Sequence, residues 1–247
     1  MEILSKILKE RPEFHEGETE VRGTFSIDES LLSKRITGEL LLNKSACYGI
    51  SADVATFIFD NVSQESVTLE IGAGISTLVF ALRGSKHTTV TPNEREIDKI
   101  KEYAKANNIS TALITFIPEE SESLLPRLHT DDLDFVLIDG KHAFPWPIID
   151  WFYTVDRLNK NGILLVDDVH LISGSILVEF MQVDPRWQLV KKFDKRAVAF
   201  RKEAESIHDV AWHMQPYLME SYKRANKGLI NRLRRIKAGL HHLLRSK

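Results

Sequence analysis

The stretch Thr68-Leu69-Glu70-Ile71-Gly72-Ala73-Gly74-Ile75-Ser76-Thr77 decides the fold of this 247-residue chain. Its first half is typical of a buried strand, its glycines of a tight loop, and its last residues of a helix start. A strand, a glycine loop and a helix in this order form a ligand-binding corner of an open α/β sheet. The glycines let the backbone approach the ligand, and the free N–H groups of the helix start donate to it.

Glu70 indicates which kind of ligand this corner binds. A dinucleotide-binding fold places its acidic residue after the second strand, whereas here an acid ends the first strand, beside the glycines. Thr77 also stands where the third glycine of the dinucleotide motif would be. A carboxylate at this point repels a pyrophosphate and attracts a cation. We therefore expect S-adenosylmethionine, which carries a sulfonium and an ammonium group.

Strands and helices alternate on both sides of this stretch. The expected strands cover residues 67–71, 87–91, 112–117, 133–138, 163–166, 187–192 and 196–200. The expected helices cover residues 46–60, 75–82, 93–107, 121–128, 147–159 and 173–182, with a turn at 160–162. This alternation predicts a doubly wound α/β fold with a mainly parallel sheet, and the last two strands predict an antiparallel hairpin at its edge.

Composition and charge are those of an ordinary globular protein, with 43% hydrophobic and 28% charged residues. A formal net charge of −2 provides no overall field that would select nucleic acid. Cys47 is the single cysteine, which excludes an intrachain disulfide and favours the cytoplasm. Residues 1–6 lack the apolar core of a signal peptide, and no apolar run has the length of a membrane span. We therefore expect a cytoplasmic protein.

Two extensions flank the domain that we expect at residues 46–201. Residues 1–45 are an N-terminal extension and expected substrate cap, with a short amphipathic helix at 1–10. Residues 202–247 are a helical tail, in which 223–247 combine recurring Lys and Arg, no acid, and Leu and Ile at helical spacing. We expect this basic helix to dock on the domain or on a second copy of the chain. Anionic lipid and a charged substrate carrier are alternatives, whereas nucleic acid is not expected because interleaved aromatic residues are missing.

Three motifs, in this order, give the chain a resemblance to the class I S-adenosylmethionine-dependent methyltransferases. They are Glu70-x-Gly72-x-Gly74, Asp139-Gly140-x-His142, and Asn161-Gly162 followed by an apolar strand that ends in Asp167-Asp168. The resemblance spans about residues 46–201 and implies a seven-stranded, Rossmann-like sheet. It also implies that the ligand lies at the carboxyl ends of the central strands, as in open α/β sheets generally.

The resemblance further implies a set of residues that contact the cofactor. Those near its methionine and ribose are Glu70, Gly72, Ala73 and Gly74. Thr77, which opens the adjoining helix, and Asp139 are further expected contacts. Family members usually carry an acid after the second strand for the ribose hydroxyls, but here Asn93 is the nearest candidate and no carboxylate stands at the strand end. Glu120 and Ser121 lie where the family often contacts adenine, and a solvated helix start is the alternative for Glu120.

Asp139, Asp167 and Asp168 follow neighbouring strands of the expected sheet, so their side chains should converge at one of its edges. Carboxylates in one cleft repel one another unless a cation lies between them, and oxygen-rich sites suit Mg²⁺ or Mn²⁺. Their spacing resembles that of divalent-metal-dependent O-methyltransferases, which implies that His142 is a catalytic base. The alternatives are that the acids cap loops or contact the cofactor, and that His142 stabilises a loop.

These features predict methyl transfer from S-adenosylmethionine to a hydroxyl of a small molecule or a sugar. Asp139 would contribute to a metal site and His142 would take the proton of the acceptor. Phe144 and Trp146, next to the catalytic loop, are the expected wall of the acceptor site. Two other classes remain open. The missing ribose acid favours a non-catalytic cofactor-binding or scaffold protein, and an NAD-dependent oxidoreductase is the third class, against which Glu70 argues.

Overall fold

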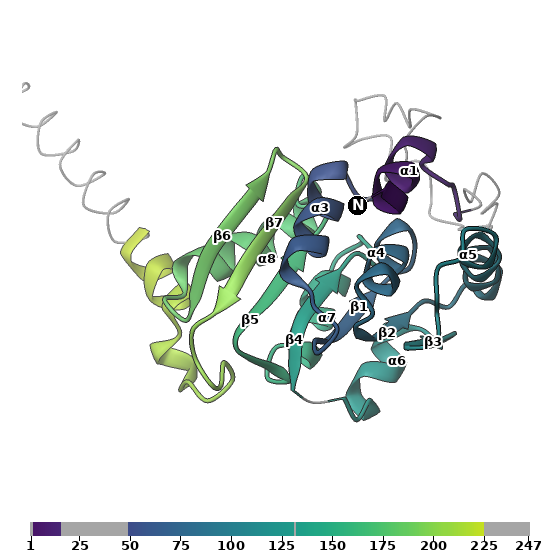
Figure 1. Cartoon of the computed structure of the whole chain (residues 1–247). Helices are drawn as coiled ribbons and strands as arrows, with labels where there is room; N and C mark the ends of the chain where they lie inside the picture. The colour runs from purple at the N-terminus through teal and green to yellow at the C-terminus, as the bar shows by residue number, and fades with distance from the viewer. Residues whose placement is uncertain (1, 16–48, 131, 225–247) are drawn as a thin grey trace, which may run out of the picture.

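The computed structural model describes residues 2–15, 49–130 and 132–224. This part of the chain forms one sheet with helices on both faces (Figure 1). The strands are β1 (Val67–Ile71), β2 (Lys86–Val90), β3 (Ile114–Ile117), β4 (Leu133–Ile138), β5 (Leu158–Val166), β6 (Trp187–Phe193) and β7 (Ala197–Lys202).

The sheet has seven strands in the order β3-β2-β1-β4-β5-β7-β6. Strands β1 to β5 pair in parallel, whereas β7 is antiparallel to both β5 and β6. The predicted doubly wound sheet with an antiparallel edge hairpin is therefore confirmed. Because the order reverses at β1 and β4, the carboxyl ends of these two strands border the crevice in which such sheets bind ligands.

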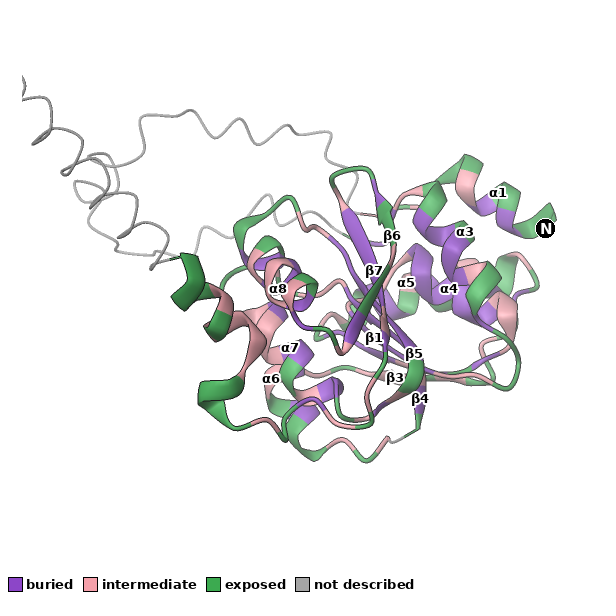
Figure 2. Cartoon of the chain, turned by 90° about the vertical axis from the view of Figure 1, so that its left-hand side faces the viewer, coloured by how far each residue is buried: buried purple, intermediate pink, exposed green. Residues whose placement is uncertain are grey.

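The helices form two layers, and Figure 2 shows the buried strands between them. Helices α1 (Glu2–Glu10), α3 (Ala52–Asn61), α4 (Ile75–Arg83) and α5 (Glu94–Ala106) cover one face. Helices α6 (Ser121–Leu124), α7 (Trp146–Thr154) and α8 (Ile172–Val183) cover the other. Short 3-10 turns follow at η1 (Leu125–Arg127) and η2 (Trp212–Met214). Alternate residues of β4 enter the two layers, Phe135 and Leu137 on one side, Val136 and Ile138 on the other.

The region around residues 155–162 differs from the prediction. Helix α7 ends at Thr154 and β5 already begins at Leu158, so the helix expected to reach 159 is too long. The expected turn at 160–162 lies inside β5, where Asn161 has a φ of 70° and the pairing with β4 shifts register. A lysine at the end of the neighbouring strand β7 stabilises this arrangement, because Lys202 Nζ donates to the carbonyls of Val155 (2.9 Å) and Leu158 (2.6 Å).

Smaller differences concern element ends. The strand expected at 112–117 begins at Ile114, and the helix expected at 121–128 continues as a 3-10 turn after Leu124. The helix expected at 46–60 begins at Ala52, where Ser51 Oγ accepts from Val54 N at 3.2 Å and caps it. Residues 46–48 of that prediction lie outside the described part.

The first fifteen residues belong to the same core as the sheet. Leu4, Ile7 and Phe14 are buried in the cluster that α3 and α4 share. Tyr103 of α5 donates to Glu10 at 2.5 Å, and its ring lies 5.8 Å from that of Phe14. The helix predicted at 1–10 is therefore present, and it packs on the domain, while residues 16–45 of the expected cap lie outside the described part.

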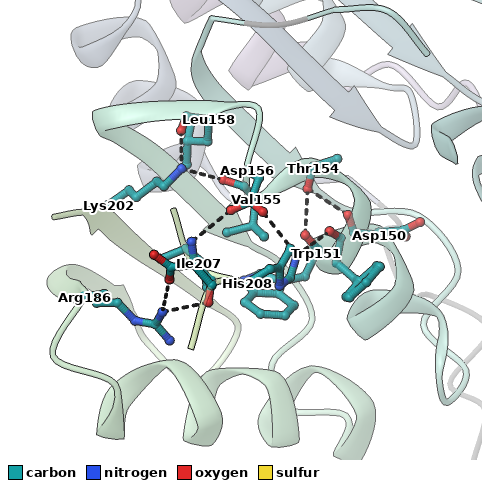
Figure 3. A network of polar contacts seen from close by, with 12 residues as sticks. Asp150, Trp151, Thr154, Val155, Asp156, Leu158, Arg186, Lys202, Ile207 and His208 are labelled. Atoms are coloured by element: carbon teal, nitrogen blue, oxygen red, sulfur yellow. Dashed lines mark hydrogen bonds and ion pairs between the residues drawn. The ribbon is translucent and has the colours of Figure 1, made fainter. Parts of the chain in front are cut away.

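A polar network, here called the C-terminal clasp, holds the segment after β7 against α7 and α8 (Figure 3). It consists of Asp156, Asp184, Arg186, Lys202 and the backbone of Ile207. Asp156 accepts from Ile207 N at 2.9 Å, and Arg186 donates to Ile207 O at 2.7 Å and twice to Asp184. These hydrogen bonds hold the segment in place, although it is neither a helix nor a strand.

The chain then continues as a helix over residues 216–224, which packs on α8. Tyr217 lies 5.7 Å from the ring of Phe180, and Arg224 pairs with Glu179 at 2.6 Å. Beyond Lys223 and Arg224, the predicted basic helix at 223–247 lies outside the described residues. No helix of the described part is both long and apolar enough to cross a membrane.

Candidate active site

The glycine loop after β1 forms one side of the site. Gly72 has a φ of +100°, and a Cβ there would lie 2.3 Å from the carbonyl oxygen of Asp139, so the position requires glycine. Its N–H donates to Val90 O at 2.9 Å, which joins the loop to the end of β2. A Cβ at Gly74 would meet no atom within 4 Å, so the space beside the start of α4 is open. The loop therefore offers backbone groups next to an open space.

Hydrogen bonds of the Glu70 side chain hold this loop in place. Its side chain is buried, with 1% of the residue exposed. Its Oε1 accepts from Thr89 at 2.8 Å and from Thr77, whose hydroxyl in turn accepts from Gly74 N at 3.0 Å. Glu70 and Thr77 thus fix the conformation of the loop. Direct contacts of these two side chains with a cofactor stay predictions.

The ends of β4 and β5 bring together two acids and a histidine. Single side-chain atoms of Asp139, His142 and Asp168 lie within 4.8 Å of one another. His142 Nε2 is 3.1 Å from Asp168 Oδ2, and the Ser173 hydroxyl of α8 donates to the carbonyl of His142. The loop after β4 is thereby held against the loop after β5. We refer to Asp139, His142, Asp167 and Asp168 as the acidic cluster.

Asp167 has a different environment from the other acids, which changes the predicted ligand set of Asp139, Asp167 and Asp168. It is buried, and Arg196 Nε lies 3.6 Å from its Oδ1 and 3.2 Å from Asp168 Oδ1. Asp168 has a φ of 50°, and this left-handed turn directs it toward His142 while Asp167 stays inside. In the described part, His142 therefore takes the place of Asp167 as the third candidate ligand.

Burial and mutual repulsion set the pKa values of the acidic cluster. Burial raises the pKa of Asp139 well above its usual value, and the charges of Asp167, Asp168 and Glu70 raise it further. Burial raises the pKa of Asp167 to about 6, against a lowering by hydrogen bonding and Arg196. Burial also lowers the pKa of His142, against the raising effect of Asp168. The imidazole of His142 is therefore neutral near pH 7 and can accept a proton.

A known protein family is similar to the central segment of the chain. The profile of a methyltransferase domain family matches residues 69–169, the segment that contains the three motifs and the acidic cluster. Residues 69–169 are therefore similar to a methyltransferase domain, as the three motifs of this segment predict. No curated protein sequence matches the chain.

Solved structures with the same fold have low sequence identity to this chain. TomG, an O-methyltransferase of Streptomyces achromogenes involved in tomaymycin synthesis, is similar with a TM-score of 0.52 and 15% identity. The match covers 72% of this chain and 96% of that one. The Podospora anserina methyltransferase PaMTH1, solved with S-adenosylhomocysteine, is similar with a TM-score of 0.53 and 16% identity over 71% of this chain and 86% of that one. These likenesses show the fold alone.

The structure also locates the remaining predicted cofactor residues. Asn93 Oδ1 accepts from Glu96 N at 3.3 Å and caps α5, so its side chain already has a structural role. Glu120 pairs with Lys141 Nζ at 2.7 Å, which connects the loop after β3 to the loop after β4. Ser121 is buried at the start of α6. All three lie beyond the carboxyl ends of β2 and β3, and their contacts with a cofactor stay predictions.

Two buried acids near the site were missed by the sequence analysis. Glu96 accepts from Thr91 Oγ1 at 3.0 Å, directly after β2. Its spacing from Asn93 is that of a capping box, which predicts a side chain folded back toward the strand end. Asp150 lies buried in α7, and neither of its oxygens has a well-aligned hydrogen bond within the described part. An acid in the otherwise apolar stretch 146–152 was the available signal.

Proposed function

We propose that this methyltransferase transfers the methyl group of S-adenosylmethionine to a hydroxyl oxygen of a small molecule or a sugar, with His142 as the general base. The observation that carries the proposal is the group of Asp139, His142 and Asp168 beside the glycine loop. The two features meet directly, because Asp139 N donates to Ile71 O at 2.9 Å and its carbonyl lies against Gly72.

The charge of the site supports a cationic cofactor. Glu70, Asp139, Asp167 and Asp168 lie at the carboxyl ends of β1, β4 and β5, and Arg196 is the cation that contacts Asp167 and Asp168. An excess of carboxylates stabilises a sulfonium and an ammonium group by Coulomb attraction. The same excess opposes the pyrophosphate of NAD, which speaks against an oxidoreductase.

The pairing of His142 with Asp168 supports transfer to a hydroxyl. An alcohol is a weak nucleophile until a base removes its proton, and a neutral imidazole oriented by a carboxylate is suited to that task. The acceptor oxygen forms a bond to the methyl carbon while the carbon–sulfur bond breaks and its electron pair stays on sulfur. The hydroxyl proton moves to His142, and S-adenosylhomocysteine leaves. Holding oxygen, carbon and sulfur in line supplies much of the acceleration.

The site also fits a divalent cation. Asp139 and Asp168 offer carboxylate oxygens of the kind that Mg²⁺ and Mn²⁺ prefer, and the unbonded buried oxygens of Asp167 add negative charge nearby. A bound ion would lower the pKa of the acceptor hydroxyl. His142 cannot use the same nitrogen to bind the ion and to accept the proton. We therefore propose that Asp139 and Asp168 would hold the ion and that His142 stays free as the base.

The rim of the site favours a small acceptor with an apolar or ring-shaped face. Phe144 and Ile172 are strongly exposed at the starts of α7 and α8, and Lys141 Nζ lies 4.7 Å from the ring of Trp146. Rings and sugar faces stack on such side chains. The acids behind this rim would repel a phosphate backbone, which argues against nucleic acid as the acceptor.

Titration calorimetry with S-adenosylmethionine and with NAD⁺ tests the cofactor, and release of S-adenosylhomocysteine with catechol and sugar acceptors tests the reaction. We expect micromolar binding of S-adenosylmethionine alone, and turnover that falls with EDTA if the ion is needed. Asp139→Asn should abolish turnover, whereas Asp134→Asn, at the opposite end of the same strand, should not. Binding of NAD⁺, or cofactor binding without turnover on any hydroxylated acceptor, would overturn the proposal.

A further inference from the structure

A carboxylate from α5 stands at the carboxyl end of β2, where the strand itself has none. Glu96 belongs to the first turn of α5, yet its Oε2 accepts from the hydroxyl of Thr91, the residue after β2, at 3.0 Å. This strand end also touches the glycine loop, because Gly72 N donates to Val90 O at 2.9 Å. The helix therefore brings a negative charge to the place where β2 and the glycine loop meet.

The N-terminal segment covers this carboxylate. His15 Nδ1 lies 2.5 Å from Glu96 Oε1, and the pair leaves Glu96 with 1% of its surface exposed while half of the His15 side chain faces solvent. The preceding residue, Phe14, is buried against Tyr103 of α5 and anchors the segment. A ligand can therefore bind Glu96 Oε1 only after the imidazole of His15 has moved away from this oxygen.

His15 also lies within electrostatic range of the catalytic loop. The pKa of His142 is lowered chiefly by burial, and the charge of His15 is among the smaller causes that lower it further. Gly72 lies between the end of β2 and the acidic cluster, because its N–H donates to Val90 O and the carbonyl of Asp139 lies against it. Glu96 and His15 at the end of β2 therefore border the same region as the acidic cluster.

We propose that Glu96 is the carboxylate that binds the ribose diol of the cofactor, and that His15 occupies it in the ligand-free protein. The inference rests on the proposed function, since it requires a nucleoside ligand in this crevice. Nucleotide-binding α/β sheets use an acid about 20 residues beyond the glycine loop to accept from ribose hydroxyls. Glu96 has that distance along the chain and that place at the strand end, and its two oxygens can accept from both hydroxyls.

The test compares two ligands on the full chain by titration calorimetry: S-adenosylhomocysteine and its 2′,3′-dideoxy analogue. A hydrogen bond to a charged group contributes about 1.5–3 kcal/mol, so the unchanged protein should prefer the diol about 10–100-fold. Glu96→Gln should reduce this preference to about threefold or less. Glu94→Gln is the matched control, because Glu94 lies in the same helical turn but is exposed, and it should keep the full preference.

His15→Ala tests the second half of the proposal and leaves Glu96 intact, which also serves if Glu96→Gln does not fold. It should bind S-adenosylhomocysteine about 3–10-fold more tightly, since no pairing has to be broken first. An unchanged diol preference in Glu96→Gln, or weaker binding in His15→Ala, would overturn this inference alone. If the unchanged protein bound neither S-adenosylmethionine nor S-adenosylhomocysteine, the proposed function itself would fall.

Discussion

The two ends of helix α7 carry polar clusters of opposite character. After its last turn, the C-terminal clasp gives each charged side chain a partner: Lys202 donates to two carbonyls, and Arg186 binds Asp184 through two nitrogens. Before its first turn, the acidic cluster contains an Asp167 whose oxygens lack a well-aligned hydrogen bond, beside an Asp139 with a strongly raised pKa. Satisfied polar groups stabilise a fold, whereas unsatisfied ones persist where a ligand supplies the missing partner.

Among the substitutions that test this difference between the two clusters, one at His142 should have the largest effect on activity. His142→Gln removes the base but keeps a polar side chain, so kcat should fall about 10²–10⁴-fold. The free energy of unfolding should change by less than about 0.5 kcal/mol, because the side chain is partly exposed. Steady-state kinetics and chemical denaturation measure the two quantities. His170→Gln is the control, since His170 lies 3.6 Å from Asp168 but more exposed, and a comparable loss there would contradict the assignment of the base.

The opposite result is expected in the clasp. Lys202→Met keeps the length of a fully buried side chain but removes the donor for the carbonyls of Val155 and Leu158. Leaving these carbonyls unpaired should lower the free energy of unfolding by about 2–4 kcal/mol. Activity per folded molecule should not change. Lys192→Met, at an exposed position of the neighbouring strand β6, should leave both quantities unaltered. A clasp variant that unfolds normally but loses turnover would show that the two ends of α7 are not separate in function.

Asp150, inside α7 between the two clusters, should make stability depend on pH. Burial raises its pKa to about 6, although the nearby Ser121 hydroxyl lowers it. The folded state therefore binds the proton more tightly than the unfolded state does. The contribution favours folding at low pH and is lost as pH rises from about 4 to about 6. Asp150→Asn should remove this dependence and raise the free energy of unfolding above pH 7 by about 1–3 kcal/mol. Denaturation midpoints between pH 4 and 8 measure it, and a steeper pH dependence in the variant would contradict the assignment.

The success and failure of the sequence analysis follow the same division between local and distant causes. The strand, glycine loop and helix at 67–83 were predicted because Gly72, Gly74 and Thr77 act on their own neighbours. The end of α7 was predicted wrongly because the carbonyls of Val155 and Leu158, which follow the helix, accept from Lys202, 44 residues beyond Leu158.

Within the site, the parallel strand ends predicted that Asp139, Asp167 and Asp168 would converge, and Asp139 and Asp168 do lie together. The strand ends did not predict that His142 joins these two acids in place of Asp167, because this depends on the left-handed φ of Asp168 and on Arg196, which comes from the turn before β7. Glu96 was missed for a related reason: the acid at the end of β2 is contributed by a helix, and only the packed structure brings it back to the strand.

The smallest effect is expected at Asn93, where stability and cofactor affinity together distinguish a helix cap from a ligand contact. Its Oδ1 accepts from Glu96 N, so Asn93→Ala should lower the free energy of unfolding by about 1 kcal/mol, as for other N-caps. Ser51→Ala, which removes the cap of α3, should cost a similar amount. If Asn93 acts through α5 alone, the two variants should bind S-adenosylmethionine equally well, within about twofold of the unchanged protein. If Asn93 also contacts the ribose, as the sequence analysis expected, only its own variant should lose affinity, about tenfold for one hydrogen bond of about 1.4 kcal/mol. Calorimetry on this pair decides whether the cap is also a ligand.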